Sequence, residues 1–317
     1  MKIRFGYVAT ALGLWDASPS KTLTYTRFCK LNKHERMDLL KTITAKNLAH
    51  TKRILHYNLA HEIKLYRFSS ALVPLATHPE VKWDFITPFR SEWKQLGELI
   101  KLGSMRPSFH PGQYTLFTSP RNGVTENAVF DMEYHYKMLE AMGIEQDAAI
   151  NIHIGGAYGD KKSTLIRFHE NLKTLPNHIK RIMTLENDDK TYNIRETLEA
   201  CEKENIPMVL DYHHYIVNKD GLELEVYIDR IFKTWTERNL LPIVHLSSPK
   251  SKNELRAHND FVALDFVLPF IKLAKELNRD FDCMIEAKQK NLAMFRFIEE
   301  LTSIRGIRRI DSSSIEW

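Results

Sequence analysis

The segment MVLDYHH, at residues 208–214, is a short apolar run that ends in an aspartate and two histidines. Five other segments share this design, in which a strand-like apolar run is followed by a histidine or a carboxylate. They read RPSFHPGQY around His110, NIHIGG around His153, MTLEND around Glu186, PIVHLSS around His245 and CMIEAK around Glu286. Side chains that follow separate parallel strands meet at the C-terminal end of a barrel. The sequence therefore predicts one bowl in which these groups converge.

The six segments belong to eight alternating strand–helix units along a chain of 317 residues. The expected strands begin at Ile3, Leu65, Arg106, Ala148, Arg181, Met208, Ile243 and Phe281. Apolar spacing predicts a helix after each strand, the longest from about His34 to about His61. Runs such as MVL and CMI suit strands that are buried on both faces of a parallel sheet. We therefore predict an α/β protein with one domain, a (β/α)8 TIM barrel over residues 1–317. Its short polar tail, 305–317, matches no element.

The composition is that of an ordinary globular protein, with 43% hydrophobic and 27% charged residues. No stretch approaches the length of about 20 apolar residues that a membrane span needs, and the start MKIRFGYVAT does not resemble a signal peptide. The three cysteines stand far apart and form no disulfide framework. We expect a cytoplasmic monomer with no membrane partner. The net charge of +5 permits a polyanionic partner without requiring one.

Half of the 14 histidines fall on or beside predicted helices, where a solvated or half-buried side chain is expected. The other seven follow strands: His78, His110, His153, His213, His214, His245 and His258. One such histidine is ordinarily a core residue. Three at the ends of separate strands, together with two carboxylates and an Asp–His pair, indicate a metal site instead. Imidazole and carboxylate ligands suit Zn, Mn or Fe better than Ca or Mg.

Glu186 and Glu286 each follow an apolar strand, where an unpaired charge would be costly to bury. Bound cations remove that cost, and the alternative is an ion pair with a lysine such as Lys288. Asp211 and His214 are three residues apart, so each can reach a different ion. His258, near Asp260, could serve a third ion or could lie in a solvated loop.

Two or three clustered metal ions suit the hydrolysis of a phosphate ester. Sugar isomerases also use two metals on this kind of barrel, so the ligands alone leave both functions open. The neighbours His213, Lys288 and His78 are candidates for residues that support the ligands from behind.

Seven motifs occur in an order that resembles the ultraviolet damage endonuclease family, called UVDE or UvsE. They are GYV (6–8), HPGQY (110–114), IHIGGAYGDK (152–161), LEND (185–188), DYHH (211–214), VHLSSP (244–249) and EAK (286–288). The wider relative is endonuclease IV, on a xylose-isomerase-like barrel. The resemblance implies incision of damaged double-stranded DNA immediately 5′ to cyclobutane pyrimidine dimers and 6-4 photoproducts, and possibly at abasic sites. It also implies two or three divalent ions, typically Mn with Mg, Zn or Co as alternatives, no ATP, and a nucleoid-associated location in a prokaryote.

The resemblance also assigns roles to residues. Glu186 would bridge two ions, and Glu186, Glu286 and His245 would be catalytic. Gln113 and Tyr114 would wedge into the duplex. The implied metal ligands are His110, His153, Glu186, Asp211, His214, His245, His258 and Glu286.

Tyr7 would contact the damaged strand. Basic residues after the fourth and seventh strands, Lys161, Lys250 and Arg256, would meet DNA phosphates at the rim. Two positions depart from the family pattern. Some relatives have a lysine where this chain has Ile243, and an asparagine near the place of Ala11. A lesion-binding protein without enzymatic activity would keep the basic rim but would not need eight ligands.

Overall fold

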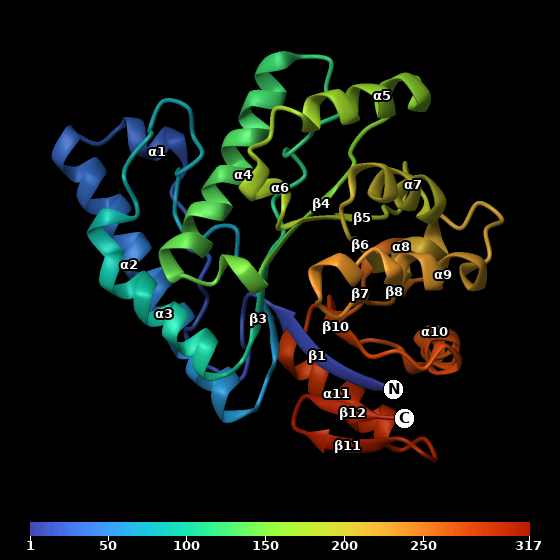
Figure 1. Cartoon of the computed structure of the whole chain (residues 1–317). Helices are drawn as coiled ribbons and strands as arrows, with labels where there is room; N and C mark the ends of the chain where they lie inside the picture. The colour runs from blue at the N-terminus through green and yellow to red at the C-terminus, as the bar shows by residue number, and fades with distance from the viewer.

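Eight parallel strands close into a barrel in the computed structural model, which describes residues 1–317 (Figure 1). The strands are β1 (Lys2–Val8), β2 (Leu65–Arg67), β3 (Arg106–Phe109), β4 (Ala149–His153), β5 (Met183–Glu186), β6 (Met208–Asp211), β7 (Ile243–Leu246) and β10 (Phe281–Ile285). β10 pairs in parallel with both β7 and β1, so this ring of strands closes on itself. The predicted (β/α)8 barrel is confirmed.

Helices follow the strands and surround the barrel (Figure 1). The long ones are α2 (Lys33–Ala60), α3 (Arg90–Leu102), α4 (Asn122–Met142), α5 (Lys161–Leu172), α7 (Ile194–Glu204), α9 (Leu224–Lys233), α10 (Leu264–Leu277) and α11 (Lys290–Thr302). The short ones are α1 (Tyr25–Cys29), α6 (Asn177–Lys180) and α8 (Tyr212–Val217), with 3-10 turns at Thr87–Phe89, Glu145–Asp147 and Thr236–Arg238. α2 starts at a capping box between Asn32 and Glu35, as its sequence favours. No helix is long and apolar enough to cross a membrane.

Strand alternation decides which side chains enter the barrel. On β1, Phe5 points outward and packs edge-on against Phe297 of α11, with ring centroids 5.9 Å apart. Arg4 and Gly6 therefore face the lumen. At Gly6 a side chain is excluded because a Cβ would lie 2.1 Å from the carbonyl oxygen of Leu65 on β2.

A buried ion-pair network fills the N-terminal end of the lumen. Asp282 of β10 accepts from Arg4 at 2.6 Å and from Arg106 of β3 at 2.8 Å. The guanidinium of Arg106 also lies 4.8 Å from the ring centre of Trp235. Each buried charge thus has a partner, which a low-dielectric interior requires. His110 and Glu286 lie four residues further along β3 and β10. The same face of these strands therefore carries the buried ion pairs at the N-terminal end of the lumen and the candidate metal ligands at the C-terminal end.

The polar tail forms a hairpin that completes the sheet. Its strands are β11 (Arg308–Asp311) and β12 (Ser314–Glu316), and β12 pairs antiparallel with the first half of β1. There is room because β2 is short and pairs with β1 only from Gly6 onward. The two termini consequently lie side by side, with the amino group of Met1 3.1 Å from the carbonyl oxygen of Trp317 (Figure 1).

The Lys- and Ser-rich segment after β7 forms a hairpin of β8 (Pro249–Ser251) and β9 (Glu254–His258). Between β6 and β7, α9 ends at Lys233, and a separate 3-10 turn follows.

Candidate metal centre

Glu186, the last residue of β5, lies at the centre of the predicted bowl and is 1% exposed. Imidazoles from four other segments surround its carboxylate. The nearest nitrogen–oxygen distances are 3.3 Å to His110, 3.9 Å to His153, 3.3 Å to His214 and 3.1 Å to His245. A single buried carboxylate that faces four imidazoles is suited to share its two oxygens between cations.

Seven of the eight predicted ligands form three overlapping triads, and we call these seven residues the bowl. Within each triad the ligand atoms lie within 4.8 Å of one another. Glu186 belongs to the first and second triads, and Asp211 belongs to the second and third. The triads are His110–His153–Glu186, Glu186–Asp211–His214 and Asp211–His245–Glu286.

Sheet register explains why the bowl assembles. β4 and β5 pair His153 with Glu186, and β6 and β7 pair Asp211 with His245. Residues paired in a parallel sheet point to the same face, so these side chains enter the lumen together. Asp211 also caps α8 by accepting from the backbone N–H of His214 at 2.7 Å. That cap places His214 one turn later, above the same carboxylate.

The bowl holds an excess of negative charge. Burial alone would raise the pKa of Glu186, but His245 and His153 outweigh it and hold that pKa well below its usual range. Burial likewise opposes protonation of His214, yet Asp211 and Glu186 raise its pKa to about 11. The pKa of Asp211 is raised by burial. The proton on His214 therefore neutralises part of the negative charge of the bowl, and a divalent cation would neutralise more of it.

Two buried atoms in the bowl have no hydrogen-bond partner, namely Asp211 Oδ2 and His153 Nδ1. An unsatisfied buried polar group costs about 1–3 kcal/mol, so such atoms are rare unless they serve a ligand. Together with the mixture of imidazole and carboxylate donors, they fit divalent metal ions.

Two residues that the sequence analysis missed hold the ligands in place. Arg67, the last residue of β2, donates to Glu286 at 2.5 Å and to His245 Nε2 at 2.9 Å. Asn151 of β4 donates to Glu186, while its carbonyl oxygen accepts from the Thr184 hydroxyl at 2.8 Å. Both could have been found by strand alternation, since Arg67 ends a barrel strand and Asn151 stands two residues before His153.

His258, the eighth predicted ligand, lies beside the triads rather than in one. Its Nδ1 donates to the backbone carbonyl of Glu286 at 2.7 Å, and its ring centre is 6.3 Å from that of His214. His213 supports the same hairpin, because its Nε2 donates to the carbonyl of Leu255 at 2.6 Å. Burial lowers the pKa of His213 to about 4, so the ring is neutral at physiological pH.

Two of the expected supporting residues, His78 and Lys288, make no contact with the bowl side chains in this structure. His78 lies in the loop after β2, where its ring stacks on Tyr25 with centroids 3.9 Å apart, outside the bowl. Lys288 is exposed, and its side chain makes no hydrogen bond or ion pair. Lys290 lies deeper, where burial lowers its pKa and Glu286 opposes that effect.

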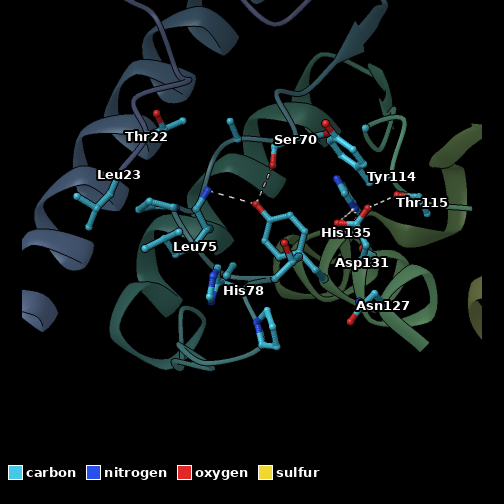
Figure 2. Close-up of a pocket in the computed structure, with 18 residues that line it drawn as sticks. Thr22, Leu23, Ser70, Leu75, His78, Tyr114, Thr115, Asn127, Asp131 and His135 are labelled. Atoms are coloured by element: carbon cyan, nitrogen blue, oxygen red, sulfur yellow. Dashed lines mark hydrogen bonds and ion pairs between the residues drawn. The ribbon is translucent and has the colours of Figure 1, made fainter. Parts of the chain in front are cut away.

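Gln113 and Tyr114 form the tip of an exposed loop between two cavities. Tyr114 is 80% exposed and lines a cavity of about 760 Å³, whereas Gln113 lines one of about 300 Å³ that His110 also borders. Figure 2 shows Tyr114 above the larger cavity, with Thr115 joined to Asp131 of α4 beneath it. The loop is thus a ridge with a fixed base.

The other residues expected to meet DNA are differently placed. Tyr7 is fully buried, and its hydroxyl donates to Asn58 of α2 at 2.6 Å, so a contact with DNA would need a movement of the surrounding chain. The three basic residues lie at the surface in ion pairs: Lys161 with Glu196, Lys250 with Glu254, and Arg256 with Asp189. Exposed pairs of this kind contribute at most about 1 kcal/mol, so a phosphate can replace the carboxylate.

Comparison with known proteins agrees with this geometry. The sequence profile described as UV-endonuclease UvdE matches residues 3–317. The UV DNA damage endonuclease of Bacillus cereus (strain 03BB102) is 57% identical over 317 residues, which cover 100% of both chains. The crystal structure of SacUVDE superposes with a TM-score of 0.84 at 29% identity, over 95% of this chain and 98% of that one. Endonuclease IV from Thermus thermophilus shares the fold, with a TM-score of 0.54 at 13% identity, over 80% of this chain and 95% of that one.

Proposed function

This chain belongs to the UV-endonuclease UvdE family and is a UV DNA damage endonuclease, and from that premise we propose which bond it breaks. We propose that it hydrolyses the DNA phosphodiester immediately 5′ to cyclobutane pyrimidine dimers and 6-4 photoproducts, and at abasic sites. That cut would begin an excision repair that needs no ATP. The observation that carries the proposal is the buried Glu186 carboxylate among four imidazoles, next to the exposed ridge of Gln113 and Tyr114. A monomer located in the cytoplasm at the nucleoid stays a prediction.

The bowl residues and His258 would hold two or three divalent cations, most favourably Mn, with Mg, Zn or Co as alternatives. When bound, such ions supply the positive charge that an anionic phosphodiester needs during hydrolysis. Glu186 would be suited to bind two of these cations, because its two oxygens face different histidines.

The chain's own groups would orient the reaction. Arg67 and His245 act against burial to keep the pKa of Glu286 below its usual range, so that carboxylate is ionised. In the proposed mechanism, Glu286 accepts a proton from the attacking water through Oε2, while Arg67 and His245 hold Oε1 in place. The bond between phosphorus and the 3′ oxygen breaks, and that oxygen takes up a proton from solvent. His245 lies 3.1 Å from both Glu186 and Glu286 and fixes their separation.

Lesion recognition would use the ridge. A lesion weakens base stacking, so the cost of opening the duplex there, a few kcal/mol elsewhere, is reduced. Tyr114 and Gln113 would occupy the opened step, as apolar and polar wedges do in proteins that kink DNA. The Thr115–Asp131 hydrogen bond would keep the ridge from yielding when the duplex presses on it.

The test is incision of ultraviolet-irradiated against unirradiated supercoiled plasmid, after chelation and return of Mn, Mg, Zn or Co. We expect Glu186→Ala to abolish nicking while circular dichroism reports an intact barrel. The exposed Glu254→Ala serves as the matched carboxylate control and should nick normally. Unchanged nicking by Glu186→Ala would remove Glu186 from the reaction.

A second variant tests the wedge. Tyr114→Ala should lower the preference for irradiated plasmid and leave the Mn dependence unchanged. Leu102→Ala removes another exposed apolar side chain, 75% exposed at the end of α3, and should change neither. Equal losses on damaged and undamaged DNA would argue against a wedge.

A further inference from the structure

Trp15 is the most exposed large apolar side chain of the protein, at 91%. It stands in the loop between β1 and α1, outside the seven motifs quoted above. Trp83, Trp93 and Trp235 are buried, and Trp317 is partly covered by Lys275. Covering this apolar surface with a partner would be favourable, and the charges around its loop indicate what kind of partner fits.

The loop that carries Trp15 is fixed rather than loose. Arg53 of α2 donates to the backbone carbonyls of Trp15 at 2.7 Å and Asp16 at 2.9 Å. Further along, Asn47 of α2 brackets Lys21, accepting from its backbone N–H at 3.0 Å and donating to its carbonyl at 2.9 Å. The exposed indole is therefore held on a rigid support, which lowers the entropy lost on binding.

Basic side chains lie along the loop that carries the indole, and we call Trp15, Lys21, Lys46 and Arg53 the Trp15 patch. Lys46 lies 3.5 Å from Asp16, which is the one carboxylate paired with these cations. The positive charge of Lys46 lowers the pKa of Lys21. Arg53 donates hydrogen bonds to neutral backbone carbonyls, so no carboxylate offsets its positive charge. Three cations against one carboxylate leave a surplus that suits an anion.

The patch belongs to the same end of the barrel as the bowl. Its loop leaves the C-terminal end of β1, and Ser20 is hydrogen bonded at 2.7 Å to Ser69, two residues after Arg67. The next residues, Thr22 and Leu23, line the larger cavity that Tyr114 also lines. Figure 2 shows Thr22 and Leu23 on the opposite side of that cavity from Tyr114. The patch thus lies across the cavity from the ridge.

We propose that the Trp15 patch is a second DNA contact, which grips the duplex that flanks the lesion while the ridge probes the lesion itself. The inference rests on the proposed function. Lys21 and Lys46 would neutralise two backbone phosphates, and the indole would lie against the adjoining sugars. Contacts to phosphate and sugar position a protein on DNA without reading sequence. The patch therefore sets affinity and register, and the ridge sets lesion preference.

Trp15 provides its own probe, because it is the most accessible indole. The fluorescence of Trp15 is obtained as the difference between the wild type and Trp15→Phe, with acrylamide as a neutral quencher. We expect quenching of Trp15 to fall toward that of the buried tryptophans when the full-length protein binds a lesion duplex in chelator. The protection should disappear as the duplex is shortened on one side of the lesion only.

Affinity gives an independent readout. Trp15→Ala should weaken binding of a long lesion duplex about 5- to 30-fold, within the range found for aromatic contacts to nucleic acid. The double variant Lys21→Ala/Lys46→Ala should reduce the slope of log K against log salt by about 2, because two phosphate contacts are lost. Both should keep the ratio of damaged to undamaged binding, which Tyr114→Ala should change.

Each outcome decides the inference. Protection of Trp15 together with the reduced salt slope supports it. Full acrylamide access in the DNA complex, or an unchanged slope, overturns it, and the patch then awaits a protein partner. Absence of nicking by the wild type would refute the proposed function instead, so the two failures are distinguishable.

Discussion

Asn151 offers the sharpest test of the bowl, because it holds Glu186 without being a ligand itself. Its amide donates to Glu186 and its carbonyl accepts from Thr184, and both partners are almost wholly buried. Asn151→Leu keeps the size of the side chain and removes both hydrogen bonds. Loss of a group that orients a metal ligand typically costs 10- to 100-fold in metal affinity, or about 1.4–2.7 kcal/mol. We expect a Mn affinity lower by that factor.

Thr184→Val is the graded companion of this variant. It removes only the hydroxyl that orients Asn151, so the loss is that of one net hydrogen bond, about 1 kcal/mol or roughly fivefold in affinity. The expected order of Mn affinity is therefore wild type, Thr184→Val, then Asn151→Leu. Because Asn151→Leu also leaves the Thr184 hydroxyl unsatisfied, the metal-free protein should lose about 1–3 kcal/mol of unfolding free energy.

The assay combines calorimetric titration of Mn with nicking of irradiated plasmid over a range of Mn concentrations. Unfolding in chelator, followed by circular dichroism, separates weaker binding from weaker folding. Nicking by both variants should recover when Mn is saturating, since no ligand has been removed. If Asn151→Leu is folded and binds Mn as tightly as the wild type, then Glu186 does not hold cations in the way inferred here.

Three further predictions concern charge and packing. Burial lowers the pKa of His135, so as the pH falls below about 6.5 the imidazole takes up a proton in the unfolded chain but not in the folded protein. The unfolding free energy should therefore fall by up to about 1.4 kcal/mol per pH unit below that pH. His135→Gln should make this pH dependence weaker in denaturant titrations. Deletion of residues 306–317 removes the fully buried Ile315 and the strand paired with β1, and the urea midpoint should drop by the equivalent of at least about 2 kcal/mol. Arg67→Met removes a positive charge beside the third triad, an effect of roughly 4 kcal/mol for unit charges about 4 Å apart at an effective dielectric of 20. It also removes the hydrogen bonds that orient Glu286 and His245, which costs about 1.4–2.7 kcal/mol. The charge effect is the larger, so Mn binding at the third triad should strengthen about tenfold, and unchanged calorimetric isotherms would contradict this.

Much of the fold could be predicted from the sequence because each barrel strand is a short continuous segment with its own apolar pattern. Each strand is a short apolar run, and six of the eight carry a candidate ligand at or next to their last residue, as at Glu186 and Asp211. Two-residue periodicity then fixes which side chains share the lumen. This rule predicted the positions of six bowl residues without any knowledge of the contacts between strands, and His214 follows Asp211 by one turn in α8.

The remainder depends on contacts between distant segments. Strand alternation could have placed Arg67 in the lumen. It could not have shown that Arg67 contacts His245, which lies 178 residues further along the chain. The GYV motif predicted the strand that contains Tyr7. It did not predict that the Tyr7 side chain is buried against α2, where it donates to Asn58. The C-terminal hairpin can pair with β1 because β2 pairs only with the second half of that strand, from Gly6 onward. In each case tertiary packing, rather than local pattern, decides the outcome.

Arg67 also bears on the missing lysine at position 243. Strand alternation points Ile243 into the lumen, where it packs with Ala149, Val209 and Trp235, so this position supplies no charge. The fixed cation beside the third triad is instead the guanidinium of Arg67. Once a cation has displaced the proton on His214, the formal charges with neutral imidazoles are −1 for the first triad, −2 for the second, and −2 offset by +1 for the third. The second triad, built on Glu186 and Asp211, is then the most negative, and it contains Asp211 Oδ2, which has no hydrogen-bond partner. The cation that binds first should therefore be the one that Glu186 and Asp211 share.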